Sequence, residues 1–252
     1  MEGQHAHASS WMRRLREFRL RAGHPGLHAM FKARLAPGTF AGLPLTLMCI
    51  AALCTAALLA GLVDDVRETE GVVRLDQGAT AFFGPFRTPM LVSAFVWITA
   101  LGAGPAITGM AAVASALLWS QGQARLLMPL WLAFVGAEGT TWAGKYAIGR
   151  ARPALLDAMD MAAATPSFPS GHATASTALI GFLAYVVSRG LPGRRGRFGV
   201  AFGSAVLVGL ICFSRVFLGV HYLSDVAAGV LVGVFWLLAG IAAAELRRRS
   251  AP

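Results

Sequence analysis

Long apolar stretches dominate this 252-residue chain, and short polar segments separate them. A helix needs about 20 mostly apolar residues to cross the hydrocarbon of a bilayer, and several windows of that length occur here. Six such spans are predicted, at residues 43–63, 104–120, 126–148, 171–189, 198–217 and 221–244. The pattern therefore predicts an all-α fold, a single bundle of six transmembrane helices.

A second apolar run, residues 90–101, comes shortly before the second span. The sequence Gly-Ala-Gly-Pro at residues 102–105 separates the two, and Gly and Pro interrupt helices. We therefore expect a helix at the membrane interface followed by a shorter span, rather than one long helix. Phe82, Phe83 and Phe86 are expected to dip into the outer leaflet.

The composition agrees with a membrane protein. The chain is 56% hydrophobic and 13% charged, and its mean hydropathy is +0.61, whereas soluble domains carry roughly 25% charged residues. All three cysteines, Cys49, Cys54 and Cys212, lie within apolar spans. Their odd number provides no disulfide framework, and we interpret them as small core residues.

The net charge of +10 would suggest nucleic acid as a partner of a soluble protein. With both chain ends in the cytoplasm, however, fifteen of the 22 basic residues fall on the cytoplasmic side. This asymmetry follows the positive-inside rule, so it predicts an orientation in the inner (cytoplasmic) membrane and no nucleic-acid partner.

The chain ends are basic. Residues 1–42 form a cytoplasmic N-terminal arm in which the spacing over residues 11–18 is typical of a short helix on anionic lipid, with a disordered tail as the alternative. Residues 43–245 hold the six spans, and residues 246–252 form a basic cytoplasmic tail.

Three polar groups lie at the outer ends of the spans. In the first, Lys145 and Arg152 are seven residues apart, so they project from one side if the helix continues that far. Two cations without an adjacent acid attract an anion. The alternative is a pair of side chains that snorkel at a helix end.

The second group is Pro169-Ser170-Gly171-His172, which opens the fourth span. A helix N-terminus presents unpaired backbone N–H groups and a positive dipole end, which together bind phosphate. Gly171 lets the backbone approach closely, and Ser170 either caps the helix or donates to the anion. An ordinary helix start is the alternative.

The third group contains Ser214, Arg215, His221 and Asp225. On a helix, the Asp225 carboxylate lies one turn from the His221 imidazole, on the same face. A carboxylate that accepts from one ring nitrogen leaves the lone pair of the other free, which makes a nucleophile. A structural His–Asp pair is the alternative.

Together these groups provide what phosphoryl transfer requires: donors for the phosphate oxygens, a nucleophile and an acid. Two histidines with ordinary pKa values near 6.5 divide the nucleophile and acid roles at neutral pH. The outer segments hold no Asp/Glu or Cys/His cluster with metal-ligand spacing. We therefore expect catalysis without a divalent ion or other cofactor.

The motifs Lys-x6-Arg-Pro, Pro-Ser-Gly-His and Ser-Arg-x5-His-x3-Asp resemble the three-part signature of the type 2 phosphatidic acid phosphatase family, which shares its site with vanadium haloperoxidases. The six-span layout is similar to the family's bacterial membrane members. The resemblance implies that His221 attacks phosphorus to give a phosphohistidine, that Asp225 orients it, and that His172 protonates the leaving oxygen and then activates water. The residues implied to bind the phosphoryl oxygens are Lys145, Arg152, Ser170, Gly171 and Arg215.

The resemblance implies an integral membrane phosphatase acting on a lipid phosphomonoester or diphosphate. Candidate substrates are undecaprenyl diphosphate, phosphatidate, phosphatidylglycerophosphate and a lipid A phosphate. Vanadate-dependent halide oxidation is a second interpretation, which the six spans disfavour. A third is a non-catalytic lipid-binding or transport protein, which should have lost the nucleophile or the acid, whereas both are present and no internal repeat is evident.

Glu138 lies outside the three motifs. It precedes Lys145 by seven residues, so it occupies the same helix face about 10 Å deeper. We expect it to shape the substrate groove or to tune the charge of the site. The alternative is a hydrogen bond to a neighbouring helix.

Overall fold

The computed structural model describes residues 33–36, 40, 42–68, 71–153 and 165–249. Contacts divide the chain into two units, Met1–Ile50 and Ala51–Pro252. The second unit holds all three motifs. The short helix predicted over residues 11–18 lies outside the described residues.

The described elements are helices, and no strand occurs among the residues that the structure describes. In chain order they are α3 (Leu43–Glu68), α4 (Gly71–Phe83), the 3-10 turn η1 (Gly84–Phe86), α5 (Pro89–Ala100), α6 (Gly104–Ser120), the 3-10 turn η2 (Ala124–Leu126), α7 (Leu127–Ile148), α9 (Gly171–Gly190), α10 (Arg194–Phe217) and α11 (Leu223–Arg249). The predicted all-α fold is confirmed.

Among the described residues, five helical stretches are long and apolar enough to cross a membrane. They are α3, the consecutive pair α5–α6, α9, α10 and α11. α7 is 22 residues long and carries Glu138 and Lys145, and it is not among the five. The protein is thus a multi-pass membrane protein, whereas the predicted count of six spans is not confirmed.

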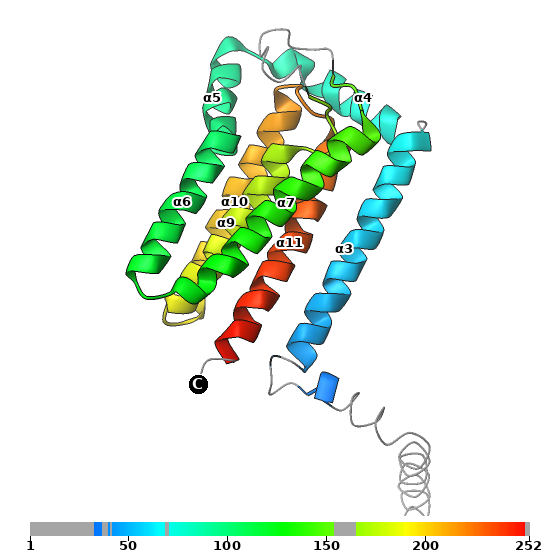
Figure 1. Ribbon diagram of the computed structural model, residues 1–252. Helices are drawn as coiled ribbons and strands as arrows, with labels where there is room; N and C mark the ends of the chain where they lie inside the picture. The colour runs from blue at the N-terminus through cyan, green and yellow to red at the C-terminus, as the bar shows by residue number, and fades with distance from the viewer. Residues whose placement is uncertain (1–32, 37–39, 41, 69–70, 154–164, 250–252) are drawn as a thin grey trace, which may run out of the picture. The chain divides into compact units, whose positions relative to one another are not determined.

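The break predicted at residues 102–105 is present, since α5 ends at Ala100 and α6 begins at Gly104. However, α5 continues in the direction of α6 (Figure 1), and together they form one apolar stretch of 32 residues. The expectation of a separate interfacial helix is therefore not confirmed. Phe83 also differs from expectation, because its ring packs edge-on against Phe213 at 5.3 Å instead of facing lipid.

α9 lies at the centre of the second unit, packed against α11, α10, α7 and α6. The glycines of α11 permit its closest approach. A Cβ atom at Gly229 would lie 2.6 Å from the Ser170 carbonyl oxygen, and one at Gly233 would lie 2.5 Å from Cβ of Thr177. Small residues allow membrane helices to pack this closely. As a result, the two N-terminal ends meet, and the Ser170 N–H donates to the Asp225 carbonyl at 3.0 Å.

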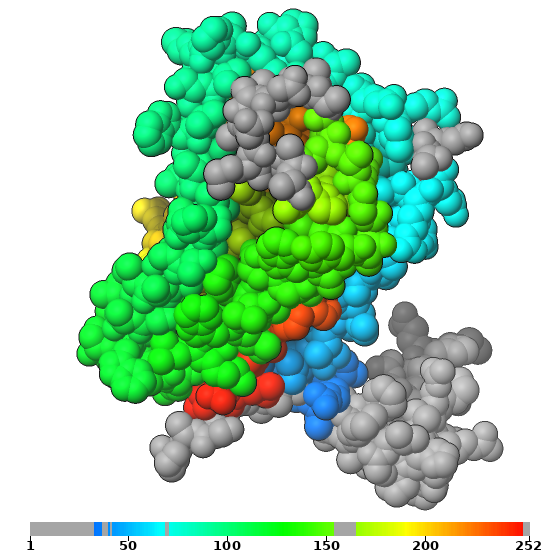
Figure 2. All heavy atoms as spheres, turned by 45° about the horizontal axis from the view of Figure 1, so that its top comes forward, coloured from blue at the N-terminus to red at the C-terminus, as the bar shows by residue number. Residues whose placement is uncertain are grey.

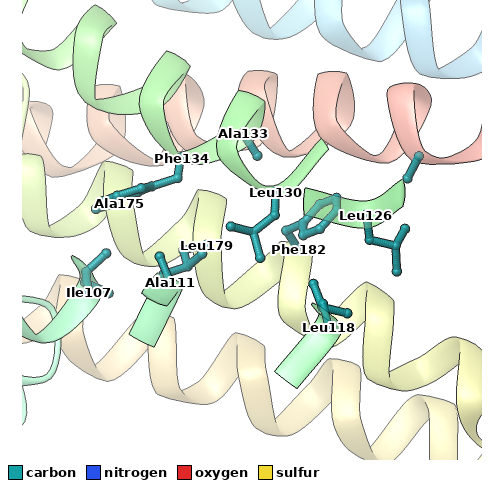
Figure 3. Packing of buried hydrophobic residues seen from close by; sticks show 11 residues of the cluster. Ile107, Ala111, Leu118, Leu126, Leu130, Ala133, Phe134, Ala175, Leu179 and Phe182 are labelled. Atoms are coloured by element: carbon teal, nitrogen blue, oxygen red, sulfur yellow. The ribbon is translucent and has the colours of Figure 1, made fainter. Parts of the chain in front are cut away.

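A buried apolar cluster joins α6, α7 and α9. In Figure 3, Leu130 of α7 lies between Leu179 and Phe182 of α9, and all three side chains are fully buried. On the α6 side the cluster contains Ile107 and Ala111. Dispersion contacts in such a cluster fix the positions of α7 and α9, whose ends carry the first two motifs.

The motifs gather at one end of the second unit. Figure 1 shows the C-terminal ends of α7 and α10 and the N-terminal ends of α9 and α11 at the end where α4 lies. The α6–α7 and α9–α10 connections and the C-terminal end of α11 lie at the other end (Figure 1). Exposed aromatic side chains mark both ends, with Tyr146 stacked on Trp142 near the motifs and Trp119 at the far end. Such aromatic residues are typical of the two membrane interfaces.

Candidate active site

His221 lies in the connection between α10 and α11, and its side chain is buried. Its Nε2 is 3.2 Å from Nη1 of Arg152, and its Nδ1 is 3.4 Å from Oδ2 of Asp225. A guanidinium nitrogen only donates hydrogen bonds, so Nε2 accepts and carries the lone pair. We therefore assign the ring proton to Nδ1, which faces the carboxylate.

The environment of His221 favours its neutral form. Burial lowers the pKa of His221 to about 4, the hydrogen bond with Asp225 opposes this shift, and the positive charge of Arg215 adds to it. His221 is therefore a free base at neutral pH, with its unprotonated nitrogen toward the cationic side of the site.

Arg152 reaches the site from a loop, because α7 ends at Ile148 and Gly149 turns the chain with a φ of +63°. The predicted common helix face of Lys145 and Arg152 is thus wrong, although the two cations do interact electrostatically. Arg152 Nε donates to the Thr165 carbonyl at 2.9 Å, and Nη1 donates to the Val220 carbonyl at 2.9 Å. Burial lowers the pKa of Arg152.

Two further cations reach the site from helices. Lys145 near the end of α7 is buried, and its Nζ donates to the Pro166 carbonyl. Arg215 near the end of α10 is 4% exposed, and its Nη1 donates to Oγ1 of Thr99 at 2.8 Å. The residues predicted to bind an anion therefore come together from α7, α10 and the loop that follows α7.

The second motif presents a buried donor. Ser170 precedes α9 without capping it through its side chain, and its Oγ has no hydrogen-bond partner among the described residues. Nε of Arg215 is likewise buried without a partner in the described part of the chain. Buried polar atoms normally have a partner, so these two donors, which belong to residues of the second and third motifs, are candidates for hydrogen bonds to a ligand.

His172 lies in the first turn of α9 and interacts electrostatically with Arg215, His221 and Arg152. The α5–α6 connection packs beside it, since a Cβ atom at Gly102 would lie 3.3 Å from Cδ2 of His172. A Cβ at Gly171 would make only an ordinary contact, 3.7 Å from Cγ2 of Thr141. Packing within the protein therefore does not require glycine at position 171.

Arg150, Asp76 and Ser224 are parts of this site that the sequence did not indicate. Nη1 of Arg150 donates to Oγ of Ser224 and to Oδ1 of Asp225, each at 2.7 Å, and Nη2 donates to Oδ2 of Asp76 at 2.7 Å. Burial opposes the charge of Arg150, but its bonds with Asp76 and Asp225 outweigh burial and raise its pKa. No spacing in the sequence predicts these contacts.

Two other expectations concern residues near the cluster. Glu138 is half-buried on α7 and interacts electrostatically with Lys145. Within the described ranges, no group of three His, Cys, Asp or Glu side chains could hold a metal ion.

Figure 2 turns the site end forward and shows orange atoms, from the region where α10 leads into α11, recessed between α7 and the turquoise α5.

Comparison with known proteins gives a family and two curated relatives. Residues 126–249 match the model of the PAP2 superfamily. The curated relatives are the decaprenylphosphoryl-5-phosphoribose phosphatases of two Mycobacterium tuberculosis strains, CDC 1551 / Oshkosh and H37Rv. Each is 42% identical over 67 residues, which are 27% of this chain and 31% of the relative. The match thus spans about a third of the relatives' length.

Two solved structures share the fold. A transmembrane PAP2 type phosphatidylglycerolphosphate phosphatase from Bacillus subtilis superposes with a TM-score of 0.70 at 23% identity, over 75% of this chain and 94% of that one. LpxE from Aquifex aeolicus superposes with a TM-score of 0.51 at 21% identity, over 66% of this chain and 94% of LpxE. The matched segment contains all three motifs, and the fold that carries them is that of PAP2-type membrane proteins; through residues 126–249, the chain belongs to the PAP2 superfamily.

Proposed function

We propose that the protein is an integral membrane phosphatase that hydrolyses a lipid phosphomonoester or diphosphate through a phosphohistidine intermediate. The observation that carries this proposal is the arrangement of His221, whose Nδ1–H faces Asp225 while Nε2 faces Arg152. A buried imidazole held as the free base beside cations is prepared to attack an anionic phosphate.

In the first step, Lys145, Arg152 and Arg215 bind the phosphoryl oxygens, together with the Ser170 hydroxyl and the backbone of Gly171. Nε2 of His221 forms a bond to phosphorus as the bond from phosphorus to the leaving oxygen breaks. The leaving oxygen keeps the electron pair and takes a proton from His172. Asp225 stabilises the positive charge that develops on the His221 ring.

In the second step, His172 changes from acid to base. His172, now neutral, accepts a proton from a water molecule whose oxygen attacks phosphorus. The N–P bond breaks, its electron pair returns to Nε2, and inorganic phosphate leaves. The three cations provide the charge that a phosphoryl-transfer site requires, so we propose that no divalent ion takes part.

The place of the site and the names of the relatives support the proposed substrate class. The site lies at the end of apolar helices, where a lipid can keep its head group in water and its chain in the bilayer. The curated relatives are named for a decaprenyl-linked phosphoribose and the Bacillus subtilis protein for phosphatidylglycerolphosphate. The candidate substrates are therefore these two lipid phosphates, undecaprenyl diphosphate, phosphatidate and a lipid A phosphate.

We further propose that both chain ends face the cytoplasm and that the site faces the exterior of the inner membrane. Arg125, Arg189 and Arg194 lie in or beside the turns at the end of the second unit opposite the site (Figure 1), as the positive-inside rule requires. In this arrangement residues 43–245 form the phosphatase domain, flanked by the basic arm and tail.

The experiment is release of inorganic phosphate by the purified protein in detergent, with EDTA present, from each candidate lipid in turn. We expect release from at least one lipid and its loss in His221→Ala. His24→Ala, in the N-terminal arm, is the matched control and should retain full activity. Phosphate trapped on the protein tests the intermediate. Phosphohistidine is acid-labile, so acid-labile trapped phosphate supports it and acid-stable trapped phosphate contradicts it.

A non-catalytic lipid-binding or transport protein of the same fold is the alternative. It predicts no phosphate release from any of these lipids by the wild-type protein. Release that survives His221→Ala would exclude the phosphohistidine mechanism, and release that EDTA abolishes would exclude metal independence.

A further inference from the structure

We propose that Asp76 and Arg150 are positioning residues that orient the nucleophile His221 through Asp225. The inference rests on the proposed function, because it assigns these two residues to the same reaction. Arg150 occupies one of the unspecified positions of the first motif, and Asp76 on α4 lies outside the motifs and outside the segment that matches the family.

Asp76 is a buried carboxylate with both oxygens engaged. It is 1% exposed; Oδ1 accepts from the Ser224 N–H at 2.9 Å, and Oδ2 accepts from Arg150 at 2.7 Å and from the Ser224 hydroxyl at 2.5 Å. Removing a carboxylate from water is costly, and a buried ion pair commonly adds little net stability. Retention of this pair beside the nucleophile therefore points to a role in the site.

Arg150 connects Asp76 to Asp225. Its Nη1 and Nη2 each hold one carboxylate at 2.7 Å, and its guanidinium lies 4.3 Å over the Tyr222 ring. Because Arg150 occupies Oδ1 of Asp225, Oδ2 is left for the Tyr222 N–H at 2.9 Å and for Nδ1 of His221. The rigid fork of the guanidinium thus sets the plane of the carboxylate that holds the imidazole.

Asp76 also fixes the backbone from which Asp225 projects. Ser224 lies in the first turn of α11, where N–H groups lack partners within the helix. Asp76 supplies such a partner from α4 and places negative charge at the positive end of the helix. Asp76 of α4 therefore holds the start of α11 directly and the side chain of Asp225 through Arg150.

The test is steady-state kinetics of Asp76→Asn on the lipid that the wild-type protein hydrolyses. We expect kcat to fall about 10-fold, a loss similar to the smallest ones seen when the hydrogen-bond partners of metal-ligating residues are removed. KM should stay within about 2-fold, because the proposed phosphate-binding groups are untouched. Arg150→Lys keeps the charge but not the fork, and we expect a similar loss of kcat.

Thr80→Val is the matched control. Thr80 is buried on α4 one turn after Asp76, and its hydroxyl donates to the Asp76 carbonyl within the helix. The activity of Thr80→Val should equal that of the wild type. A loss of activity in Thr80→Val as large as in Asp76→Asn would overturn the inference, because it would show only that α4 is sensitive to substitution.

A double-mutant cycle separates positioning from general support of the structure. If Asp76 acts through Asp225, Asp76→Asn should lower kcat no further in the Asp225→Asn background. Losses that multiply in the double variant would contradict the inference, as would wild-type kcat in both Asp76→Asn and Arg150→Lys.

The inference and the proposed function fail in different ways. If the wild-type protein hydrolyses no lipid phosphate, the proposed function is wrong. The ¹⁵N chemical shifts of the His221 ring then still report its tautomer without turnover. We expect the Nδ1-protonated form in the wild type and a loss of that preference in Asp76→Asn, and an unchanged tautomer would refute the inference.

Discussion

At the scale of single residues, the chemistry of His221 depends on its partners. Its burial keeps it neutral, Asp225 fixes its tautomer, and Arg152 lies beside its free nitrogen. Residue types and spacing predicted the pairing of His221 with Asp225. They did not predict Arg150 or Thr165, because loop residues reach the site by turns of the chain that have no periodicity.

The charges around His221 lead to a prediction of pH dependence. The nucleophile must be unprotonated, so activity should be lost as the pH falls through its pKa, about 4. Arg152 lowers this pKa and Asp225 raises it. The acid limb of kcat/KM should therefore move to higher pH in Arg152→Gln and to lower pH in Asp225→Asn.

Both variants are compared with the wild type on the same substrate, so that titration of the substrate phosphate cancels. Movement of the two acid limbs in the same direction would contradict the proposed role of His221.

Ser170 provides a second prediction at this scale. Its hydroxyl has no partner within the described residues, so Ser170→Ala removes no internal hydrogen bond and should leave the melting temperature unchanged. If the hydroxyl donates to the substrate phosphate, KM should rise about 10-fold, as expected for a hydrogen bond to a charged group.

Ser176→Ala is the matched control, because Oγ of Ser176 is also buried on α9 without a partner in the described part of the chain. Its KM should equal that of the wild type. A wild-type KM in Ser170→Ala would remove Ser170 from the phosphate site.

At the scale of elements, the close packing of α9 and α11 builds the site. Gly229 and Gly233 bring α11 against α9, so that the Ser170 N–H bonds to the Asp225 carbonyl. The second and third motifs are thereby joined through backbone. The sequence shows glycines in both spans but does not show which helices they bring together.

Gly229→Ala should therefore disturb both stability and activity. The added methyl group would lie 2.6 Å from a backbone oxygen, so the helices must separate, at a cost of about 1–3 kcal/mol for overpacking. Thermal unfolding and kcat measured on the same preparation test this expectation.

Gly203→Ala on α10 is the control, because a Cβ atom there meets nothing within 4 Å of the described structure. It should leave kcat unchanged and leave the melting temperature equal or higher, since alanine favours helix more than glycine does. Equal behaviour of the two variants would contradict the role of close helix packing.

At the scale of the whole molecule, the site end and the basic end of the second unit are opposite (Figure 1). The proposed orientation is open to a labelling test in a variant whose three cysteines are replaced. A membrane-impermeant maleimide should label Leu75→Cys, exposed on α4, in intact cells. It should label Gln121→Cys, in the α6–α7 turn, only after lysis.

Labelling of Gln121→Cys but not Leu75→Cys in intact cells would reverse the orientation. It would also place the proposed site in the cytoplasm.

The sequence alone determined the all-α membrane fold and predicted the eight residues of the site, because apolar length and motif spacing are local properties. Only the tertiary structure decided how Arg152 reaches His221, that α6 continues in the direction of α5, and that Phe83 packs against Phe213. The tertiary structure also decided that Asp76, 149 residues before Asp225, is joined to it by the guanidinium of Arg150, which pairs with both carboxylates. Contacts between distant segments depend on how helices pack, and packing is a property of the whole fold.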